Sequence, residues 1–397
     1  MISVAQAKGI ILKNYAPKSR EYLPLELLNK RILAQNLVSP INHPSFDQSA
    51  VDGYAFNFKR LINNNLKLSI IGEIQAGGHT GIKVVPGKCV RIFTGAPIPA
   101  GTDTVVMQED VITEGNSIIT GNNNLKKGAN VRLAGEQIKK GRTSLARGTE
   151  LNPAAIGFLA SLGIEKARVS KLPEVRTIIT GNEFSGNEKE LKKGRIFESN
   201  GKMLHAMLLQ MGISAQYEVC GDALSSLSEM VKLLSKQSDI LLLTGGVSVG
   251  DYDFTEKALK NNGFKIIFHK VNQKPGKPLL FAKKGSKAAF GLPGNPRAVY
   301  VCFYQYVYPY IRSTMGANAP FLKFINLPLA HDYSKNNDKK VHFIDAIIKN
   351  GCVELMNKQS SHMLKSAAEA DGLAEVPEAK KHLSKGDLVK LHLNPVL

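Results

Sequence analysis

The chain has 397 residues, of which 43% are hydrophobic and 21% charged, and its formal net charge is +19. At roughly 150 residues per domain, this length predicts two to four domains with ample hydrophobic core. The four cysteines are scattered, which argues against a disulfide framework or a thiolate zinc site. With no signal-peptide pattern at its N-terminus and no stretch apolar enough to span a bilayer, we expect a cytoplasmic protein without a membrane anchor.

The positive charge has two interpretations. It is typical of a protein that binds nucleic acid or an anionic substrate, and equally of a lysine-rich surface. Basic residues occur in short groups such as LKKG, KKGR and AKKG, without a long basic tract interleaved with aromatic residues. We therefore expect no nucleic-acid partner, whereas a polyanionic small molecule is compatible with the charge.

The first part of the chain predicts helices on both sides of a β-rich insertion. Ser3 and Gln6 have capping-box spacing ahead of apolar residues at helical intervals, which predicts an N-terminal helix. A second helix is expected within 24–35. From 42 to 141, short β-prone runs are separated by Gly, Pro and Asn turns, which is typical of a small barrel or hairpin module. Helix signals resume over 152–163.

From residue 171 onward, strands and helices alternate, which predicts a parallel, doubly wound α/β sheet domain. The predicted strands are 174–180, 215–219, 239–244, 264–271, 278–282 and 287–292, and the predicted helices are 199–212, 224–236 and 254–263. The expected fold is thus a multi-domain α/β chain. Its domains are a discontinuous helical or linker domain (1–41 and 142–170), the inserted β-rich domain (42–141), the sheet domain (171–319) and a small C-terminal β domain (320–397).

Three glycine-containing loops follow predicted strands of the sheet domain. They are TGNE (180–183), TGGVSVGDYD (244–253) and LPGNP (292–296). In a doubly wound sheet, ligands bind outside the carboxyl ends of the strands, and glycines there let backbone N–H groups approach a ligand closely. A single loop of this kind is more often a plain tight turn. Three at equivalent positions indicate a shared cleft.

Acidic and basic side chains near these loops point to a phosphate ligand with a metal ion. Glu183, Asp222 and Asp253 lie at or just past strand ends, and clustered carboxylates beside a phosphate site are typical of Mg²⁺. Helix capping is the alternative role of such residues. Lys274 and Lys277 lie on the Pro- and Gly-stiffened segment NQKPGKP, which suits an oxyanion, although either lysine alone could be merely solvated.

Known catalytic motifs of other classes are missing from the sequence. It contains no GxxxxGK[ST] phosphate loop, no GxSxG elbow and no HExxH helix, and its nine histidines are dispersed. The segments 44–56, 91–110 and 130–141 are dense in Gly, Pro and polar residues, and taken singly each is explained by surface-turn chemistry.

Taken together, these segments resemble the molybdopterin molybdenumtransferase family, whose animal member is the E domain of gephyrin. The matching stretches occur in family order and span nearly the whole chain: SFDQSAVDGYA, RIFTGAPIP, VVMQED, NVRLAGEQIKKG, LNPAAIGFLASLG, ITGNE, ESNG, TGGVSVGDYDF, KPGKP, GLPGNP and QSSHMLKSAAEADGL. The resemblance implies an enzyme that inserts molybdenum from molybdate into adenylylated molybdopterin and releases AMP. It also implies a four-domain homodimer whose active cleft lies between the sheet domain of one subunit and the inserted domain of the other.

The resemblance also assigns roles to individual residues. Asp52 matches a critical acidic position, and Thr94 and Glu136 are expected beside it in the catalytic set. Asp222 and Asp253 match positions near the metal, expected to be Mg²⁺. The positions that match pterin-, nucleotide- and phosphate-facing loops are Gly181, Asn182, Glu183, Ser199, Asn200, Gly245, Gly246, Ser248, Lys274, Lys277, Pro293, Gly294, Asn295 and Pro296.

Two departures from the family pattern leave alternatives open. Many members have an aspartate where this chain has Gln137, and some have a C-terminal arginine near the position of Asp345. Molybdopterin adenylylation uses a related sheet domain and remains an alternative activity, and a non-catalytic pterin-binding scaffold is a further one. An adenylyltransferase is a possible protein partner.

Overall fold

The computed structural model describes residues 1–60, 66–78, 81–120, 125–186, 188–191, 194–246, 254–335, 338–357 and 359–395. The chain divides into two compact units. The first comprises Met1–Gln35, Arg147–Asn152 and Arg168–Leu397, and the second comprises Asn36–Ala146 and Pro153–Ala167.

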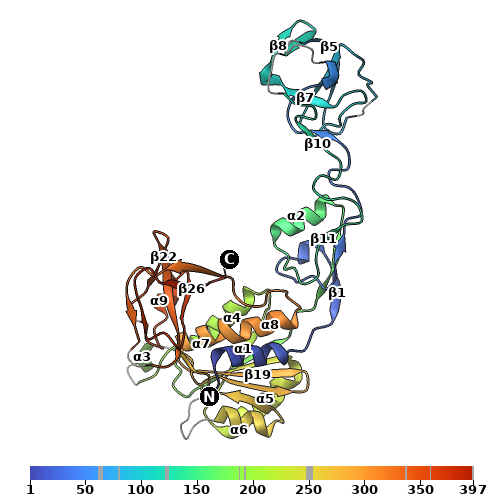
Figure 1. Cartoon of the computed structure of the whole chain (residues 1–397). Helices are drawn as coiled ribbons and strands as arrows, with labels where there is room; N and C mark the ends of the chain where they lie inside the picture. The colour runs from blue at the N-terminus through green and yellow to red at the C-terminus, as the bar shows by residue number, and fades with distance from the viewer. Residues whose placement is uncertain are drawn as a thin grey trace. The chain divides into compact units, whose positions relative to one another are not determined.

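A six-stranded sheet forms the centre of the first unit (Figure 1). Its strands, in spatial order, are β14 (Gln216–Cys220), β13 (Val175–Thr180), β15 (Ile240–Thr244), β19 (Lys287–Leu292), β18 (Leu280–Lys284) and β16 (Lys265–His269). The first four are parallel, as the alternating pattern predicts. The prediction of a wholly parallel sheet was wrong at β18, which runs antiparallel to both of its neighbours, β19 and β16. No helix connects β16, β18 and β19 among the described residues, so the chain reverses direction between them.

Helices cover both faces of this sheet (Figure 1). One face packs against α1 (Val4–Lys13), α4 (Asn200–Leu209), α7 (Pro296–Cys302), a π-helical turn (Phe303–Val307) and α8 (Tyr308–Thr314). The other face packs against α5 (Leu224–Gln237) and α6 (Phe254–Asn261). The short helix α3 (Glu188–Leu191) lies in the loop after β13.

The capping box predicted at the N-terminus is confirmed, since the Ser3 side chain accepts from the Gln6 backbone and the Gln6 side chain accepts from the Ser3 backbone. The helix predicted over 24–35 is wrong. Only a 3₁₀ turn, Leu25–Leu27, forms after β1 (Arg20–Pro24). Beyond it, Ile32 and Leu33 are buried and form β-bridges to Glu150 and Val169. Pairing with these distant segments satisfies the backbone here and overrides the local helical pattern.

The C-terminal part of the first unit is a second sheet. Its strands are β17 (Gln273–Lys274), β22 (Val341–Lys349), β24 (Gly372–Val376), β26 (Leu388–Leu393) and β20 (Phe324–Pro328), with β23 (Cys352–Leu355) paired to β22. A short pair, β21 (Tyr333–Ser334) with β25 (His382–Leu383), and helix α9 (Lys365–Glu369) complete it. Strand β17 belongs to the NQKPGKP segment, so this sheet holds one end of that loop directly.

The second unit contains a six-stranded sheet. In spatial order its strands are β7 (Thr104–Met107), β4 (Gly53–Phe56), β6 (Lys88–Ile92), β5 (Leu66–Ile74), β9 (Ser117–Thr120) and β8 (Val111–Glu114). Strand pairs β3 (Gln48–Ser49) with β10 (Val131–Arg132) and β2 (Leu37–Val38) with β11 (Thr143–Leu145), 3₁₀ turns Phe58–Arg60 and Gln108–Asp110, and helix α2 (Pro153–Ser161) accompany it. Strand β12 (Lys166–Ser170), at the boundary of the units, pairs with β1. The β-rich insertion predicted from the sequence is therefore a sheet with apolar packing on both faces.

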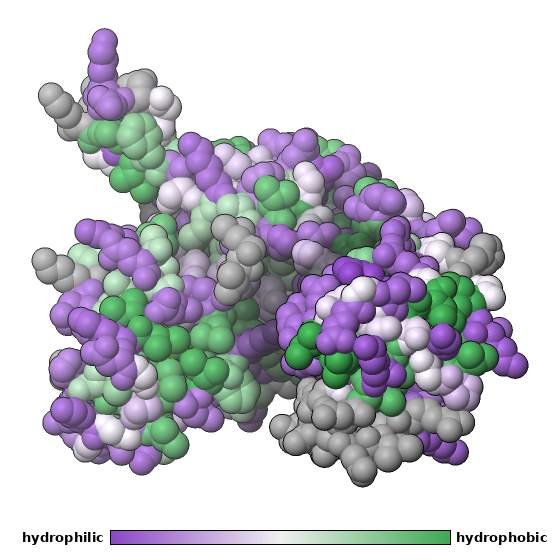
Figure 2. Space-filling view, turned by 90° about the horizontal axis from the view of Figure 1, so that it is seen from above, coloured by the Kyte–Doolittle hydropathy of each residue, from purple (hydrophilic) through white to green (hydrophobic). Residues whose placement is uncertain are grey.

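The surface is mixed in character. Figure 2 shows hydrophilic residues distributed among hydrophobic ones over the visible face. All four cysteines are free. In the part of the chain that the structure describes, every helix is too short or too polar to cross a membrane.

Candidate active site

The ends of three neighbouring parallel strands form the floor of a cavity, here called cavity A. Strands β13, β15 and β19 end in register, with Ile179 opposite Thr244 and Thr244 opposite Leu292. The cavity has a volume of about 430 Å³. It brings together these residues predicted from the sequence: Glu183, Ser199, Asn200, Gly245, Gly294, Asn295 and Pro296. The shared cleft expected from the three glycine loops is thus a cavity in the structure.

Gly245 is fixed in this cavity by sterics. Its φ of 92° lies in the left-handed region, and a Cβ added there would lie 2.4 Å from the Thr180 hydroxyl oxygen. A side chain is therefore excluded on both conformational and steric grounds. Gly246 also has a positive φ, 57°. The loop backbone consequently lies bare at the cavity edge, where a ligand can reach it.

Asn200, at the N-terminal end of α4, joins the loops that follow β15 and β19. Its side chain is 7% exposed. Its Nδ2 donates to the Thr244 hydroxyl (3.1 Å) and to the Gly294 carbonyl (2.8 Å). Thr244 in turn donates to the Pro293 carbonyl at 3.0 Å. Among the described residues, the buried Oδ1 atom of Asn200 has no hydrogen-bond partner, although such atoms are usually paired. One side chain thus joins two of the loops and keeps one acceptor atom unused within the described part of the chain.

Lys274 and Lys277 line a second cavity, here called cavity B, with a volume of about 490 Å³. Both lysines are exposed, and the bend between them contains Gly276, whose φ is 88°. A Cβ on Gly276 would lie 2.5 Å from the Cys302 sulfur, so the loop packs tightly on α7. Cavity B also contains Pro293 and Asn295. The turn Pro293–Pro296 therefore borders both cavities.

Asp222, a predicted metal ligand, lies just past the end of β14. It is held by reciprocal hydrogen bonds with Asn182, whose N–H donates to Asp222 Oδ2 (3.2 Å) while Asn182 Oδ1 accepts from the Asp222 N–H (3.3 Å). Gly181 Nα–H donates to the Cys220 carbonyl at the same strand end. Glu183 is exposed in the neighbouring loop. Asp253, the other predicted ligand, and Ser248 lie outside the described residues.

The donor chemistry at these strand ends fits a hard cation. Asp222 and Glu183 offer carboxylate oxygens on adjacent strands, which is the ligand type that Mg²⁺ prefers. Among the described residues, however, no group of three or more His, Cys, Asp or Glu side chains is placed to hold a metal ion. A complete ligand set would therefore need Asp253 or oxygens from the substrate.

The second unit contains a separate acidic site at Asp52. The Thr94 N–H and the Thr94 hydroxyl both donate to Asp52 Oδ1 at 2.8 Å. These two bonds, together with the charge of Arg91, hold the pKa of Asp52 below its ordinary value. The next residue, Gly53, has no room for a side chain, because an added Cβ would lie 1.9 Å from the Val106 carbonyl oxygen. Asp52 is therefore an ionised, tightly oriented carboxylate at neutral pH.

Glu136 and Gln137 belong to a loop joined to the same region of the second unit. Strand β10 pairs with β3, and Asp47 accepts from the Ala134 N–H at 2.7 Å. Glu136 is exposed, and its Oε2 accepts from the Leu133 N–H at 3.0 Å. Gln137 is also exposed, and its N–H donates to the His43 carbonyl. Glu136 thus already has a local turn-stabilising contact.

Several residues that line the cavities escaped the analysis of the sequence. Phe184, Ile196, Phe197 and His362 line cavity A, and Arg297, Lys340, Gln359, Ser360 and Ser361 line cavity B. A signal was present for some, because Phe197 directly precedes the ESNG stretch and the two serines belong to QSSHMLKS. Arg297 also had a signal, because it directly follows the GLPGNP stretch, whereas nothing in the local sequence of Lys340 distinguishes it from other lysines.

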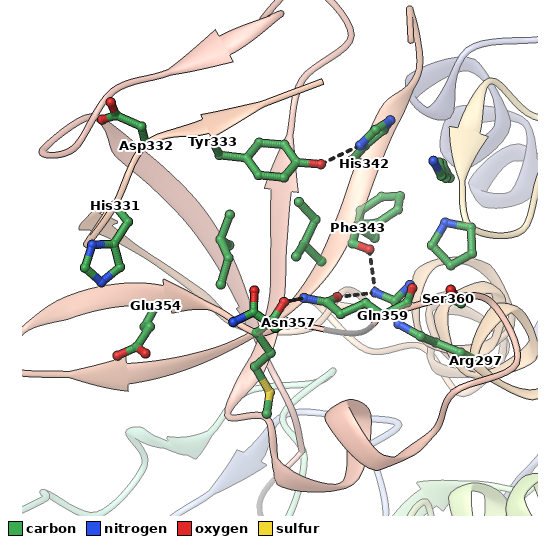
Figure 3. Close-up of a pocket in the computed structure, with 15 residues that line it drawn as sticks. Arg297, His331, Asp332, Tyr333, His342, Phe343, Glu354, Asn357, Gln359 and Ser360 are labelled. Carbon is green, nitrogen blue, oxygen red and sulfur yellow. Dashed lines mark hydrogen bonds between the residues drawn. The ribbon is translucent and has the colours of Figure 1, made fainter. Parts of the chain in front are cut away.

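A third cavity, cavity C, adjoins cavity B on the C-terminal sheet and has a volume of about 620 Å³. The two share Lys274, Pro275, Arg297, Gln359 and Ser360. Figure 3 shows the residues around it, including a hydrogen bond from the Tyr333 hydroxyl to His342 Nδ1 (2.8 Å). Burial is the largest influence on His342 and lowers its pKa. Cavities B and C therefore adjoin each other along these shared residues.

Comparisons with family models cover most of the chain. Residues 2–163 match the model of the MoeA N-terminal region (domain I and II), residues 176–313 match that of a probable molybdopterin binding domain, and residues 326–393 match that of the MoeA C-terminal region (domain IV).

Similar proteins agree with these matches. The chain is 36% identical over 341 residues to a molybdopterin molybdenumtransferase of Staphylococcus epidermidis, covering 85% of this chain and 81% of that protein. It is 34% identical to one of Nostoc sp. over 412 aligned residues, covering 99% and 94%. Its structure is similar to that of the molybdopterin biosynthesis moeA protein from Pyrococcus horikoshii, with a TM-score of 0.82 and 28% identity, covering 98% of this chain and 100% of that one.

Proposed function

The chain belongs to the molybdopterin molybdenumtransferase family, and from this premise we propose how its residues divide the work of molybdenum insertion. It is an enzyme of molybdenum cofactor biosynthesis that transfers molybdenum to molybdopterin. We propose that the molybdenum comes from molybdate, that the pterin enters in adenylylated form, and that AMP is released. The observation that carries this proposal is the convergence of three glycine loops on cavity A.

The adenylylated pterin is assigned to cavity A. The bare backbone at Gly245 lets N–H groups approach a diphosphate closely, which suits a polyanionic ligand. The unpartnered Oδ1 of Asn200 can accept a hydrogen bond from a ring N–H or amino group of a heterocycle. Pairing this buried acceptor would remove the cost of leaving it unsatisfied. Binding energy and orientation therefore come from the same side chain.

Molybdate is assigned to cavity B. It is a tetrahedral dianion, and the exposed ammonium groups of Lys274 and Lys277 supply two positive charges without a competing carboxylate among the residues that line the cavity. Lysine suits this task, since it acts as a point charge with three rotatable donors. The pterin sulfurs would then meet the oxyanion at the turn between cavities A and B.

A magnesium ion would be held by Asp222, with Asp253 and Glu183 as the other candidate carboxylates. When bound there, Mg²⁺ neutralises the diphosphate and polarises the scissile P–O bond as a Lewis acid. The hydrogen bonds from Asn182 orient the Asp222 carboxylate before any ligand arrives. This arrangement would reconcile an acidic loop with an anionic substrate.

Asp52 is proposed to orient the attacking water or molybdate. Its lowered pKa makes it a weak proton acceptor, so accepting a hydrogen bond from the nucleophile is the role that fits its environment. Thr94 holds the carboxylate in place. We expect Asp52→Asn to reduce turnover by roughly a hundredfold without unfolding the protein. Wild-type turnover in that variant would place the chemistry elsewhere.

We propose that the active enzyme is a homodimer in which Asp52 of one subunit serves the cavities of its partner. Subunit complementation tests this directly. Asp52→Asn and Lys277→Ala are each expected to be nearly inactive, but when co-expressed, randomly paired heterodimers carry one site with neither change, giving about a quarter of wild-type activity. Absence of recovery in verified heterodimers would show that each site is built within one subunit.

A molybdate titration of AMP release, with adenylylated molybdopterin and purified protein, tests the proposed reaction. Saturable, molybdate-dependent AMP release is the expected result. The adenylyltransferase alternative predicts AMP transfer from ATP onto free molybdopterin, and the scaffold alternative predicts no AMP release at any molybdate concentration. The names of the relatives favour the transferase over both.

A further inference from the structure

A buried ion pair lies where cavities B and C adjoin, since Arg297 lines both. Arg297, the residue after the turn Pro293–Pro296, directs its Nε to Asp345 Oδ2 at 2.7 Å. The two side chains are 4% and 0% exposed, which makes this the most buried ion pair among the described residues. Replacing such a pair with apolar residues is often neutral or stabilising, so stability alone is a weak reason for it.

The remaining donors of Arg297 converge on one short segment. Its Nη1 donates to the Gln359 carbonyl (3.0 Å), and its Nη2 donates to Gln359 Oε1 (2.7 Å) and to the Phe343 carbonyl (2.9 Å). Figure 3 shows the bonds from Arg297 to Gln359 and Phe343. Gln359 also accepts from the Asp345 N–H at 2.7 Å and donates to its carbonyl at 3.0 Å. The guanidinium fork therefore fixes Gln359 by both its backbone and its side chain.

The other end of this segment is bonded to the same turn. The Arg297 N–H donates to the Ser361 carbonyl at 3.1 Å, and Asn295 Nδ2 donates to the Ser361 hydroxyl at 2.9 Å. Asp345 is held in addition by the Ser366 hydroxyl at 2.6 Å. The segment 359–361 is thus fastened at both ends to the start of α7.

This segment forms one side of cavity B. Gln359, Ser360 and Ser361 line it together with Lys274 and Lys277. The side that carries Lys274 is held by strand β22. Strand β17 pairs with β22, with Gln273 opposite Val341 and Lys274 opposite His342. Asp345 is also part of β22. The C-terminal sheet therefore controls two walls of cavity B at once, one by strand pairing and one through the ion pair.

We propose that the Arg297–Asp345 pair is a latch that holds segment 359–361 against cavity B and thereby sets the affinity of that cavity for a tetrahedral oxyanion. Arg297 is a positioning residue in this scheme, because its own donors are used within the protein. The inference rests on the proposed assignment of molybdate to cavity B. It gives the C-terminal β domain a part in substrate binding.

Arginine is required at this position because of its shape. A planar fork with five N–H donors can bond a carboxylate, a carbonyl and an amide oxygen together, whereas a lysine ammonium at the same charge cannot reach all of them. Arg297→Lys should therefore keep the buried charge paired and yet loosen Gln359. Arg297→Met with Asp345→Leu removes both charges and leaves no uncompensated ion, so the domain is expected to fold.

The test measures molybdate-dependent AMP release by wild type, Arg297→Lys and the double variant. We expect the half-saturating molybdate concentration to rise about tenfold or more in both variants while kcat at saturation stays within about threefold, the pattern of lost ground-state binding. The half-saturating concentration of adenylylated molybdopterin should stay within about threefold, because segment 359–361 itself does not line cavity A. Thermal melting and circular dichroism establish that each variant is folded.

Arg312→Lys is the matched control. Arg312 lies 15 positions after Arg297 and forms an ion pair with Glu150 at 2.6 Å. It lines neither cavity A nor cavity B. Its molybdate dependence should equal that of wild type. The latch would be overturned if either variant folds and its half-saturating molybdate concentration lies within twofold of wild type. That result would leave the proposed function intact. A wild-type protein that releases no AMP with molybdate would overturn both.

Discussion

Replacing Asn200 tests whether one side chain joins the loops of cavity A. In Asn200→Ala, both donated hydrogen bonds are lost, at about 1 kcal/mol each, and the Gly294 carbonyl is left unsatisfied at a further cost of about 1–3 kcal/mol. The expected loss in the free energy of unfolding is therefore about 2–4 kcal/mol, allowing for partial relaxation.

Asn200→Asp sharpens the test because aspartate has nearly the same shape. An ionised carboxylate accepts but does not donate, so it would face the Gly294 carbonyl without a proton between them. Thr244 has no spare proton either, since its hydroxyl donates to the Pro293 carbonyl. The aspartate variant should therefore be less stable than the alanine variant by about 1 kcal/mol or more.

Urea unfolding followed by circular dichroism measures both variants. Because the chain has two units, the transition assigned to the first unit is the one to compare, and equal m values would show that the same structure unfolds. An aspartate variant that is more stable than the alanine variant would refute the hydrogen-bond assignment. So would a loss below about 0.5 kcal/mol in both, because that is typical of an ordinary surface substitution.

Two further predictions concern ionisable groups. Thr94→Val removes the hydroxyl donor to Asp52, so the pKa of Asp52 should rise toward its ordinary value. The acid limb of the pH–rate profile for AMP release should then move to higher pH. A limb at the wild-type pH would contradict this. Burial lowers the pKa of Lys8 to about 8 from 10.5, so the unfolded state binds more protons between these values and stability should rise with pH across that window. Urea unfolding at pH 8 and pH 10 should show this rise in wild type and not in Lys8→Met, and equal pH dependence in the two would refute it.

The strand-end site could be predicted because its parts follow from one rule. Parallel strands place their carboxyl ends along one edge, so the loops after Thr180, Thr244 and Leu292 had to be neighbours once the strands were identified. Asn200 lies at the same edge because it begins α4, which follows the first of these strands after the short helix α3. Local sequence patterns were sufficient to predict this edge because the same order of strand, loop and helix repeats along the chain.

Other features depend on pairings that local sequence does not encode. The apolar residues of 24–35 fit a helix as well as a strand, and only bridges to Glu150 and Val169 decide between them. The bond between Asp52 and Thr94 requires β4 to lie beside β6. The partnership of Arg297 with Asp345 joins helix α7 to strand β22 across 48 positions. Such contacts are set by tertiary packing, which overrides local preference.

Asn295 has a kinetic consequence, because it borders cavity A on one side and cavity B on the other. The adenylylated pterin in cavity A and molybdate in cavity B can each bind separately, and they meet only at the side-chain amide of Asn295. Because neither reactant then blocks the entrance of the other, the two substrates should bind in random order. Double-reciprocal plots of initial rate should give intersecting lines whether molybdate or the adenylylated pterin is the varied substrate.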